Sequence, residues 1–134
     1  MPLSDDQRKH LEFIQAVITR LASSSAAAKG WGLTVATATF GFSAAKAVPF
    51  VAILGLVVIL CFAVVDAHYL REERLFRELY NEARTGSVDL YSMDKDRYAW
   101  TCTRRQVLCS WSVAGFYTPL VVVGVAAFFW SMPR

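Results

Sequence analysis

Two long segments of this 134-residue sequence contain no charged residue. They are residues 48–65 and residues 106–133. A helix that crosses a bilayer takes about 20 apolar residues, whereas shorter runs of about 10–14 are typical of buried helices in soluble cores. The hydrophobic content of 55% is also above that of ordinary soluble domains. The absence of charge therefore argues against a soluble globular domain and predicts two membrane-spanning helices.

Motifs of catalysis and of nucleotide binding are also absent. The sequence has no P-loop, no Gly-x-Gly-x-x-Gly loop and no Cys-x-x-Cys pair, and its Ser, His and Asp residues form no nucleophile motif. Cys61 lies within a predicted span, and Cys102 and Cys109 lie at or near the expected cytoplasmic face, so no structural disulfide is expected. We therefore predict a non-enzymatic protein without a metal or other cofactor and without a nucleic-acid partner.

The N-terminus lacks the basic start and the apolar core of a secretory signal. Instead, Ser4 and Gln7 have the spacing of a helix capping box, and apolar residues follow at helical spacing. This pattern predicts an amphipathic helix over residues 4–22, ended by a bend at residues 23–25. Its apolar face would either pack against the rest of the chain or lie among lipid headgroups.

A shorter uncharged stretch, residues 30–45, is rich in small side chains. We predict a span over residues 26–45, with the long side chain of Lys29 reaching the membrane interface. The alternative is a helix that its neighbours shield from lipid. Small residues three or four apart predict close helix packing, and the helix-packing candidates are Gly30, Gly41 and Ala45. The pore-lining candidates on this helix are Thr34, Thr37 and Ser43.

The first charge-free segment runs directly into a charged one, and neither Gly nor Pro occurs from residue 56 to residue 85. One helix over residues 48–84 is therefore predicted, whose second half continues into water as a stalk. An apolar stripe on the stalk needs a cover, and we predict that neighbouring subunits supply part of it. The predicted subunit contacts are Tyr69, Leu75, Phe76, Leu79 and Tyr80.

Asp66 lies where the apolar segment ends. An acid at this point either lines a pore mouth, binds a cation or marks the boundary with water. His68 and Glu72 share a helix face at a spacing that suits a metal, but without a third ligand nearby they are more typical of an interfacial histidine beside a solvated acid. Residues 66–105 contain eight acidic and eight basic residues, so this segment is not a polybasic patch.

Basic residues indicate the orientation. Four of the 14 Lys and Arg lie in residues 1–29 and eight in residues 66–105. Because cytoplasmic segments carry an excess of Lys and Arg, both regions are expected in the cytoplasm, with the C-terminus outside. A cytoplasmic connection over 85–105 then leads to a last span over 106–131. The expected fold is all-α and multi-pass, in the inner membrane, with three transmembrane helices, an amphipathic N-terminal helix and a cytoplasmic helical stalk that extends the second span.

The junction also resembles a known family. The matching stretches are Asp66-Ala67-His68-Tyr69-Leu70-Arg71, Glu73-Arg74-Leu75-Phe76-Arg77, Leu79-Tyr80 and Ser92-Met93-Asp94. They resemble small bacterial membrane proteins of the SLATT and RipA-like kind, over about residues 48–95. The resemblance implies a homo-oligomer in lipid and, for SLATT-like members, a pore-forming anti-phage effector in systems that signal by nucleotides. The chain departs from these proteins in its third uncharged span, and it carries no appended sensor domain.

Together these patterns predict a homo-oligomer that forms or gates a membrane pore. Its partners would be further copies of the chain, membrane lipid and a cytoplasmic sensor or nucleotide-signalling protein. The alternative is a non-conducting oligomeric scaffold that organises partner proteins or lipid. A third class, a membrane enzyme, requires a buried polar cluster that the sequence does not reveal.

Overall fold

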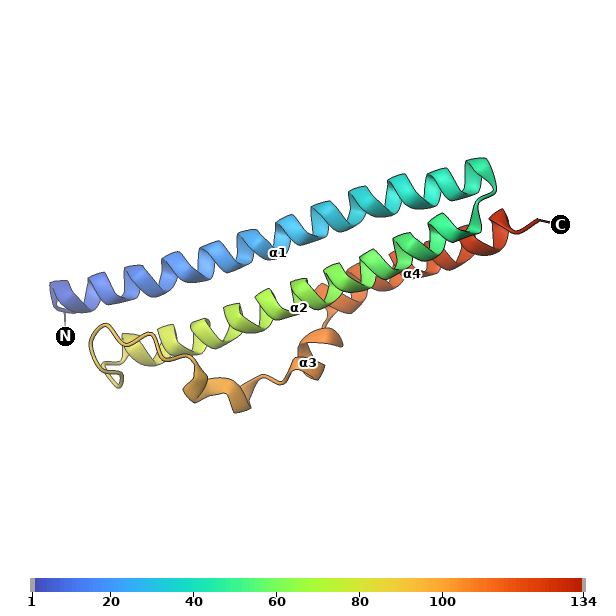
Figure 1. The fold of residues 1–134 in the computed structure, drawn as a ribbon. Helices are drawn as coiled ribbons and strands as arrows, with labels where there is room; N and C mark the ends of the chain where they lie inside the picture. Colours follow the sequence, from blue (N-terminus) through green and yellow to red (C-terminus); the bar gives the residue numbers. More distant parts are fainter. Residues whose placement is uncertain (1, 134) are drawn as a thin grey trace.

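The computed structural model describes residues 2–133 and confirms the prediction of an all-helical chain: 83% is helix, and no strand occurs in this range. The elements in order are α1 (Asp5–Lys46), α2 (Pro49–Arg84), the 3-10 helix η1 (Asp96–Thr101), α3 (Arg104–Leu108) and α4 (Trp111–Ser131). α1 and α2 form a long antiparallel hairpin, and α4 packs along the half of the hairpin that contains its turn (Figure 1). The N-terminus and the end of α2 therefore lie at one end of the molecule, and the hairpin turn and the C-terminal end of α4 lie at the other.

α1 is one continuous helix of 42 residues, which is about 63 Å long at 1.5 Å per residue. The predicted bend at residues 23–25 is therefore wrong, and residues 4–22 and 26–45 belong to one helix, whereas the span over 26–45 stays a prediction. The serines at the predicted bend do not interrupt the helix, because Ser24 donates its hydroxyl to the carbonyl of Arg20 one turn earlier, at 3.0 Å. The predicted N-cap is confirmed, since Ser4 and Gln7 exchange side-chain and backbone hydrogen bonds of 3.2 and 2.9 Å.

α2 starts at Pro49 and passes from the apolar segment into the charged segment without a break. Pro49 occupies the first turn, where its missing N–H leaves no hydrogen bond unmade. Gly86 follows the helix end with a φ of 77°, a left-handed conformation that glycine adopts without strain. Both α2 and α4 are long and apolar enough to cross a membrane, whereas α1 does not meet that criterion.

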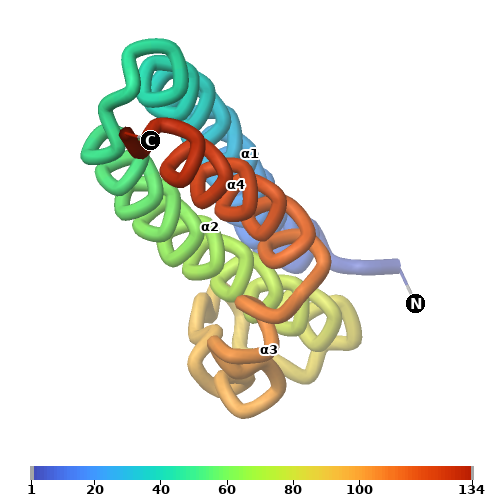
Figure 2. Tube along the Cα trace, turned by 90° about the vertical axis from the view of Figure 1, so that its right-hand side faces the viewer, coloured from blue at the N-terminus to red at the C-terminus, as the bar shows by residue number. Residues whose placement is uncertain are grey.

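The last helix begins later than predicted. The expected span over 106–131 is divided into α3 and α4, because Ser110 between them has an extended backbone with a ψ of 154°. A capping box explains the early start of α3: Thr103 and Gln106 exchange hydrogen bonds of 3.3 and 2.9 Å. α4 consequently does not continue the direction of α3. α3 lies beside α2, below the start of α4 (Figure 2).

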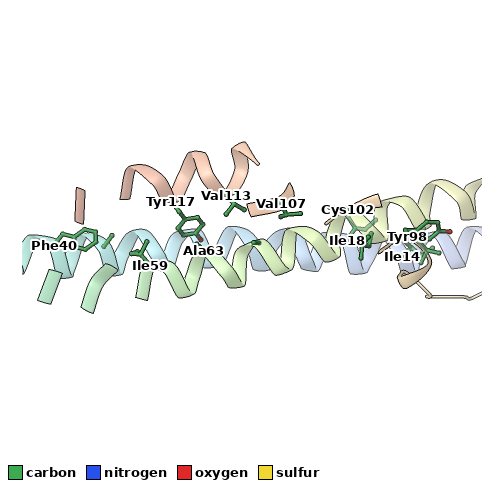
Figure 3. Close-up of a cluster of buried hydrophobic side chains, with 14 of the residues drawn as sticks. Ile14, Ile18, Phe40, Ile59, Ala63, Tyr98, Cys102, Val107, Val113 and Tyr117 are labelled. Atoms are coloured by element: carbon green, nitrogen blue, oxygen red, sulfur yellow. The ribbon is translucent and has the colours of Figure 1, made fainter. Parts of the chain in front are cut away.

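Buried apolar side chains follow the hairpin along its length. At one end Ile14 and Ile18 of α1 lie near Tyr98 of the connection, and at the other Phe40 lies near Ile59 of α2 (Figure 3). The first half of α1 thus packs against the stalk, which is one of the two positions expected for an amphipathic N-terminal helix.

The apolar half of the hairpin is the half that contains its turn and packs against α4. Close helix approaches in this half occur at glycines that the sequence did not single out. A Cβ added at Gly124 of α4 would lie 2.5 Å from atoms of both Leu56 and Phe40, and one added at Gly55 would lie 2.8 Å from Phe40. The predicted packing residues Gly30, Gly41 and Ala45 are instead exposed, and neither of these glycines has an atom within 4 Å of such a Cβ. The two glycines therefore make no close approach to another helix within residues 2–133, and helix packing by these three residues stays a prediction for contacts between copies of the chain.

Candidate functional site

Asp66 is the centre of a buried polar cluster. Its side chain is 0% exposed, and its two carboxylate oxygens are taken by Lys29, as an ion pair, and by the hydroxyl of Ser25. Lys29 Nζ also donates a hydrogen bond of 3.2 Å to Ser25 Oγ. Asp66 is therefore not exposed at a pore mouth within this chain, whereas its position at the boundary between membrane and water stays a prediction. Lys29 likewise turns toward Asp66 instead of extending to the membrane interface.

The antiparallel pairing of α1 and α2 creates this cluster. Ser25 and Lys29 are four residues apart and share the face of α1 that meets α2. Lys29 Nζ also lies 6.0 Å from the ring centroid of Phe116 in α4, within the range of a cation–π interaction. Since a buried charge is tolerated only when it is paired, these contacts hold three helices in one relative position.

Tyr117 of α4 adds a second polar group close to the cluster. Its hydroxyl is buried and has no hydrogen-bond partner among residues 2–133. The ring packs on Gly32 of α1, where an added Cβ would lie 3.5 Å from Tyr117 Cε1. The polar groups of all three long helices therefore converge near the point where the apolar half of α2 ends.

The chemistry of this cluster favours a structural role. A serine beside a lysine is a known nucleophile and base pair, but here the lysine ammonium is bound to a carboxylate and offers no free amine as a base. Ser25 is itself buried and donates its proton to Asp66. The cluster fixes the register of α1 against α2. Lys29 and Asp66 together carry no net charge.

The outward face of α1 is the second feature of interest. Over residues 26–45 this face carries a stripe of small side chains, with the large side chains of Trp31, Leu33 and Phe42 exposed beside it. The exposed residues of the stripe are Ala26, Ala27, Gly30, Thr34, Thr37, Ala38, Gly41 and Ala45. Beside it, a groove of about 620 Å³ separates α1 from α4, with Leu33 and Trp130 among its lining residues. The two predicted pore-lining threonines lie on this face, and each donates its hydroxyl to a carbonyl of its own helix at 2.9 Å.

Ser43 does not belong to this face. It is fully buried at the hairpin turn, where its hydroxyl lies 3.0 Å from the carbonyl of Val48 and 3.2 Å from Ser131 Oγ. The prediction that Ser43 lines a pore is therefore wrong. Its contacts close the end of the hairpin against the last turn of α4.

Two of the predicted subunit contacts are also wrong. Leu75 and Leu79 are fully buried inside the chain, within the same apolar cluster as Leu11 and Ile14 of α1. The apolar residues of α1 cover them, so they are not accessible to a second subunit. The other three predicted contacts, Tyr69, Phe76 and Tyr80, stay partly exposed and remain predictions.

His68 and Glu72, whose spacing could suit a metal, do not face a common site. Glu72 binds Lys95 Nζ at 2.6 Å, and this hydrogen bond raises the pKa of Lys95, whereas His68 is exposed. Over residues 2–133 no three His, Cys, Asp or Glu side chains come together in a group that suits a metal ion. Glu72 therefore anchors the connection to the stalk.

Comparison with known proteins gives no match: no family model, no curated protein and no solved structure matches this chain. The resemblance to SLATT and RipA-like proteins therefore stays a prediction. The Asp66 cluster, the outward faces of the helices and the distribution of charge are the features of the chain that bear on its function.

Proposed function

We propose that the chain is a multi-pass membrane protein that assembles into a homo-oligomer around α1 and forms or gates a pore. The membrane location is supported by the outward surfaces of α2 and α4. Only 33% of the most apolar part of α2 and 22% of that of α4 is buried. Their exposed residues include Phe50, Leu54, Val57, Leu60 and Val64 of α2 and Val122, Val125 and Phe129 of α4. Soluble monomers rarely expose a continuous apolar surface of this extent.

The contrast between the helices is the observation that carries the proposal. α2 and α4 present large apolar side chains, which suit lipid, whereas α1 presents an exposed stripe of Gly, Ala and Thr over residues 26–45, bordered by exposed Trp31, Leu33 and Phe42. Small residues allow a second helix to approach closely in a membrane. We infer that residues 26–45 form the third span and that the α1 faces of several copies meet at the centre of the assembly.

The charge distribution suggests how the protein is oriented. The stalk, the connection and the first half of α1 carry most of the charged residues and lie at one end of the molecule (Figure 1). By the positive-inside rule this end is cytoplasmic, and the C-terminus is outside the inner membrane. With the resemblance to SLATT-like proteins, the proposed role is that of an anti-phage effector that depolarises the cell when a cytoplasmic sensor or nucleotide-signalling protein triggers it.

A non-conducting scaffold is the second candidate, and one observation favours it. Ser43 and Asp66 are satisfied inside the chain, so Thr34 and Thr37 are the polar side chains left on the α1 face, and their hydroxyls already bond to their own helix. A face with so little polarity also suits direct helix packing without water. In this reading the oligomer would organise partner proteins or lipid.

Ion flux from liposomes tests the proposal. Gly41→Leu adds a large side chain to the α1 face at a position where the chain itself leaves open space, so the fold should persist while flux and oligomer size fall. Cys61→Leu is the control, because it places the same leucine side chain at an exposed position of α2. Normal flux in Gly41→Leu would refute the proposal that α1 lies at the centre of the assembly. An oligomer that conducts under no condition would refute the pore and favour the non-conducting scaffold.

A further inference from the structure

A small pocket lies between α2 and α3 on the cytoplasmic side of the apolar half. We name it the basic pocket, and its lining residues are Val64, Ala67, His68, Arg71, Arg104 and Leu108. Its volume is about 70 Å³. Half of the lining is apolar, the other half consists of two arginines and a histidine, and none of the lining residues is acidic.

Arg71 is held at the pocket by the connection. Its Nε donates to the carbonyl of Cys102 at 3.0 Å and one terminal nitrogen to the carbonyl of Ala99 at 3.5 Å. Neither acceptor carries a formal charge, so these two hydrogen bonds do not offset the positive charge of the guanidinium. The neighbouring acid, Glu72, lies 3.9 Å from Arg71 but is bound at 2.6 Å by Lys95.

Arg104 and Arg105 add further positive charge. Both are exposed, and within the described residues 2–133 neither has a carboxylate within the 4.0 Å of an ion pair. Several acids of the segment are engaged elsewhere: Glu73 binds Arg77, and Glu82 accepts a hydrogen bond from Tyr98. Residues 66–105 therefore carry equal numbers of acidic and basic residues along the sequence, whereas positive charge is in excess around the basic pocket.

The position of the pocket matches the edge of the apolar surface. Val64 and Leu108 are exposed at its rim, and Val64 continues into the exposed apolar face of α2 at Leu60. Trp111, at the start of α4, is 88% exposed. Tryptophan concentrates at the boundary between hydrocarbon and headgroups, so the basic pocket lies at headgroup level if α4 crosses the membrane from Trp111.

We propose that the basic pocket binds the phosphate of an anionic phospholipid, with the acyl chains of that lipid along Val64 and the apolar face of α2. This inference rests on the membrane location in the proposed function. Arginine binds phosphate through paired N–H donors, and the apolar half of the pocket faces the side where acyl chains lie. A soluble phosphate would use the arginines alone and leave the exposed Val64 and Leu108 uncovered.

The test reconstitutes the chain in nanodiscs of equimolar phosphatidylcholine and phosphatidylglycerol and then identifies the lipids that the purified protein retains, by mass spectrometry. Wild type should retain phosphatidylglycerol in preference to phosphatidylcholine. Arg104→Gln should lower that preference about fivefold, as expected for one basic residue at an anionic surface. Arg97→Gln is the matched control, because it removes one exposed charge from the same connection but does not line the pocket.

Four outcomes would overturn the inference. Equal retention of the two lipids, or equal effects of Arg104→Gln and Arg97→Gln, would leave no specific site. Displacement of phosphatidylglycerol by inorganic phosphate would make the pocket a site for soluble phosphate. A chain that enters nanodiscs without any lipid preference refutes this inference alone, whereas a chain that does not enter them refutes the proposed function as well.

Discussion

Breaking the buried ion pair should cost more from one side than from the other. Lys29→Met leaves the carboxylate of Asp66 unpaired at 0% exposure, whereas Asp66→Leu leaves Lys29, whose side chain is 22% exposed and reaches some solvent. Removal of one partner of a buried pair costs about 3–5 kcal/mol. We therefore expect Lys29→Met near the upper end of this range and Asp66→Leu near or below the lower end.

The double variant separates the pair from the general effect of substitution. Lys29→Met/Asp66→Leu removes both charges together, and apolar replacement of a buried pair is often neutral or stabilising. Ser25 loses its acceptor, which costs about 1 kcal/mol. The double variant should thus lie within about 1–2 kcal/mol of wild type, and the double-mutant cycle should give a coupling of several kcal/mol.

Unfolding in mixed micelles, followed by circular dichroism as the fraction of dodecyl sulfate rises, measures these differences. Lys9 and Glu12 provide the control cycle, because their side chains are 56% and 65% exposed and exposed pairs contribute only about 0.2–1 kcal/mol. Additive effects at Lys29 and Asp66 would refute the argument that they form a coupled pair. A Lys29→Met variant more stable than Asp66→Leu would refute the assignment of burial.

Three further outcomes are expected in the same unfolding assay. Gly124→Leu should destabilise the chain by at least about 1–3 kcal/mol through overpacking, whereas Gly41→Leu should not, and equal effects would contradict the helix approach at Gly124. Leu79→Ala should cost about 2–5 kcal/mol in the isolated monomer, and a loss of oligomers without a loss of monomer stability would contradict its burial. Burial, followed by its hydrogen bond to Glu82, raises the pKa of Tyr98, so the stability that it contributes is complete below the tyrosine pKa of about 10 and is lost above it; in a pH titration, Tyr98→Phe should reduce this alkaline loss.

Local patterns predicted the helices and their caps well where a few neighbouring residues decide the conformation. The capping box at Ser4, the proline start of α2 and the left-handed Gly86 each depend on hydrogen bonds or torsions within about four residues. The predicted bend at residues 23–25 failed because the local preference there is weak. Serine has a weak preference against helix, which the packing of α1 on α2 outweighs.

The site residues were predicted less well, because their environment depends on which helix faces lie against each other. Asp66 alone reads as a boundary acid; the partners that bury it, Ser25 and Lys29, are about 40 residues away along the chain. Gly30 and Gly41 have the spacing of packing residues, yet they face outward, and Gly55 and Gly124 make the close approaches. A helix has several faces, and its spacing pattern does not state which one a neighbour will cover.

The sequence by itself determined that this chain is helical, that two of its segments are apolar enough to cross a membrane and that charge is confined mainly to the rest. These properties depend on composition and on spacing along one helix. Only the tertiary structure decided that Lys29 neutralises Asp66 and that Leu75 and Leu79 are covered within the chain. Among residues 2–133 it also left Arg104 without an acid within ion-pair distance, because ion pairing depends on distances in space and not on the number of charges along the chain.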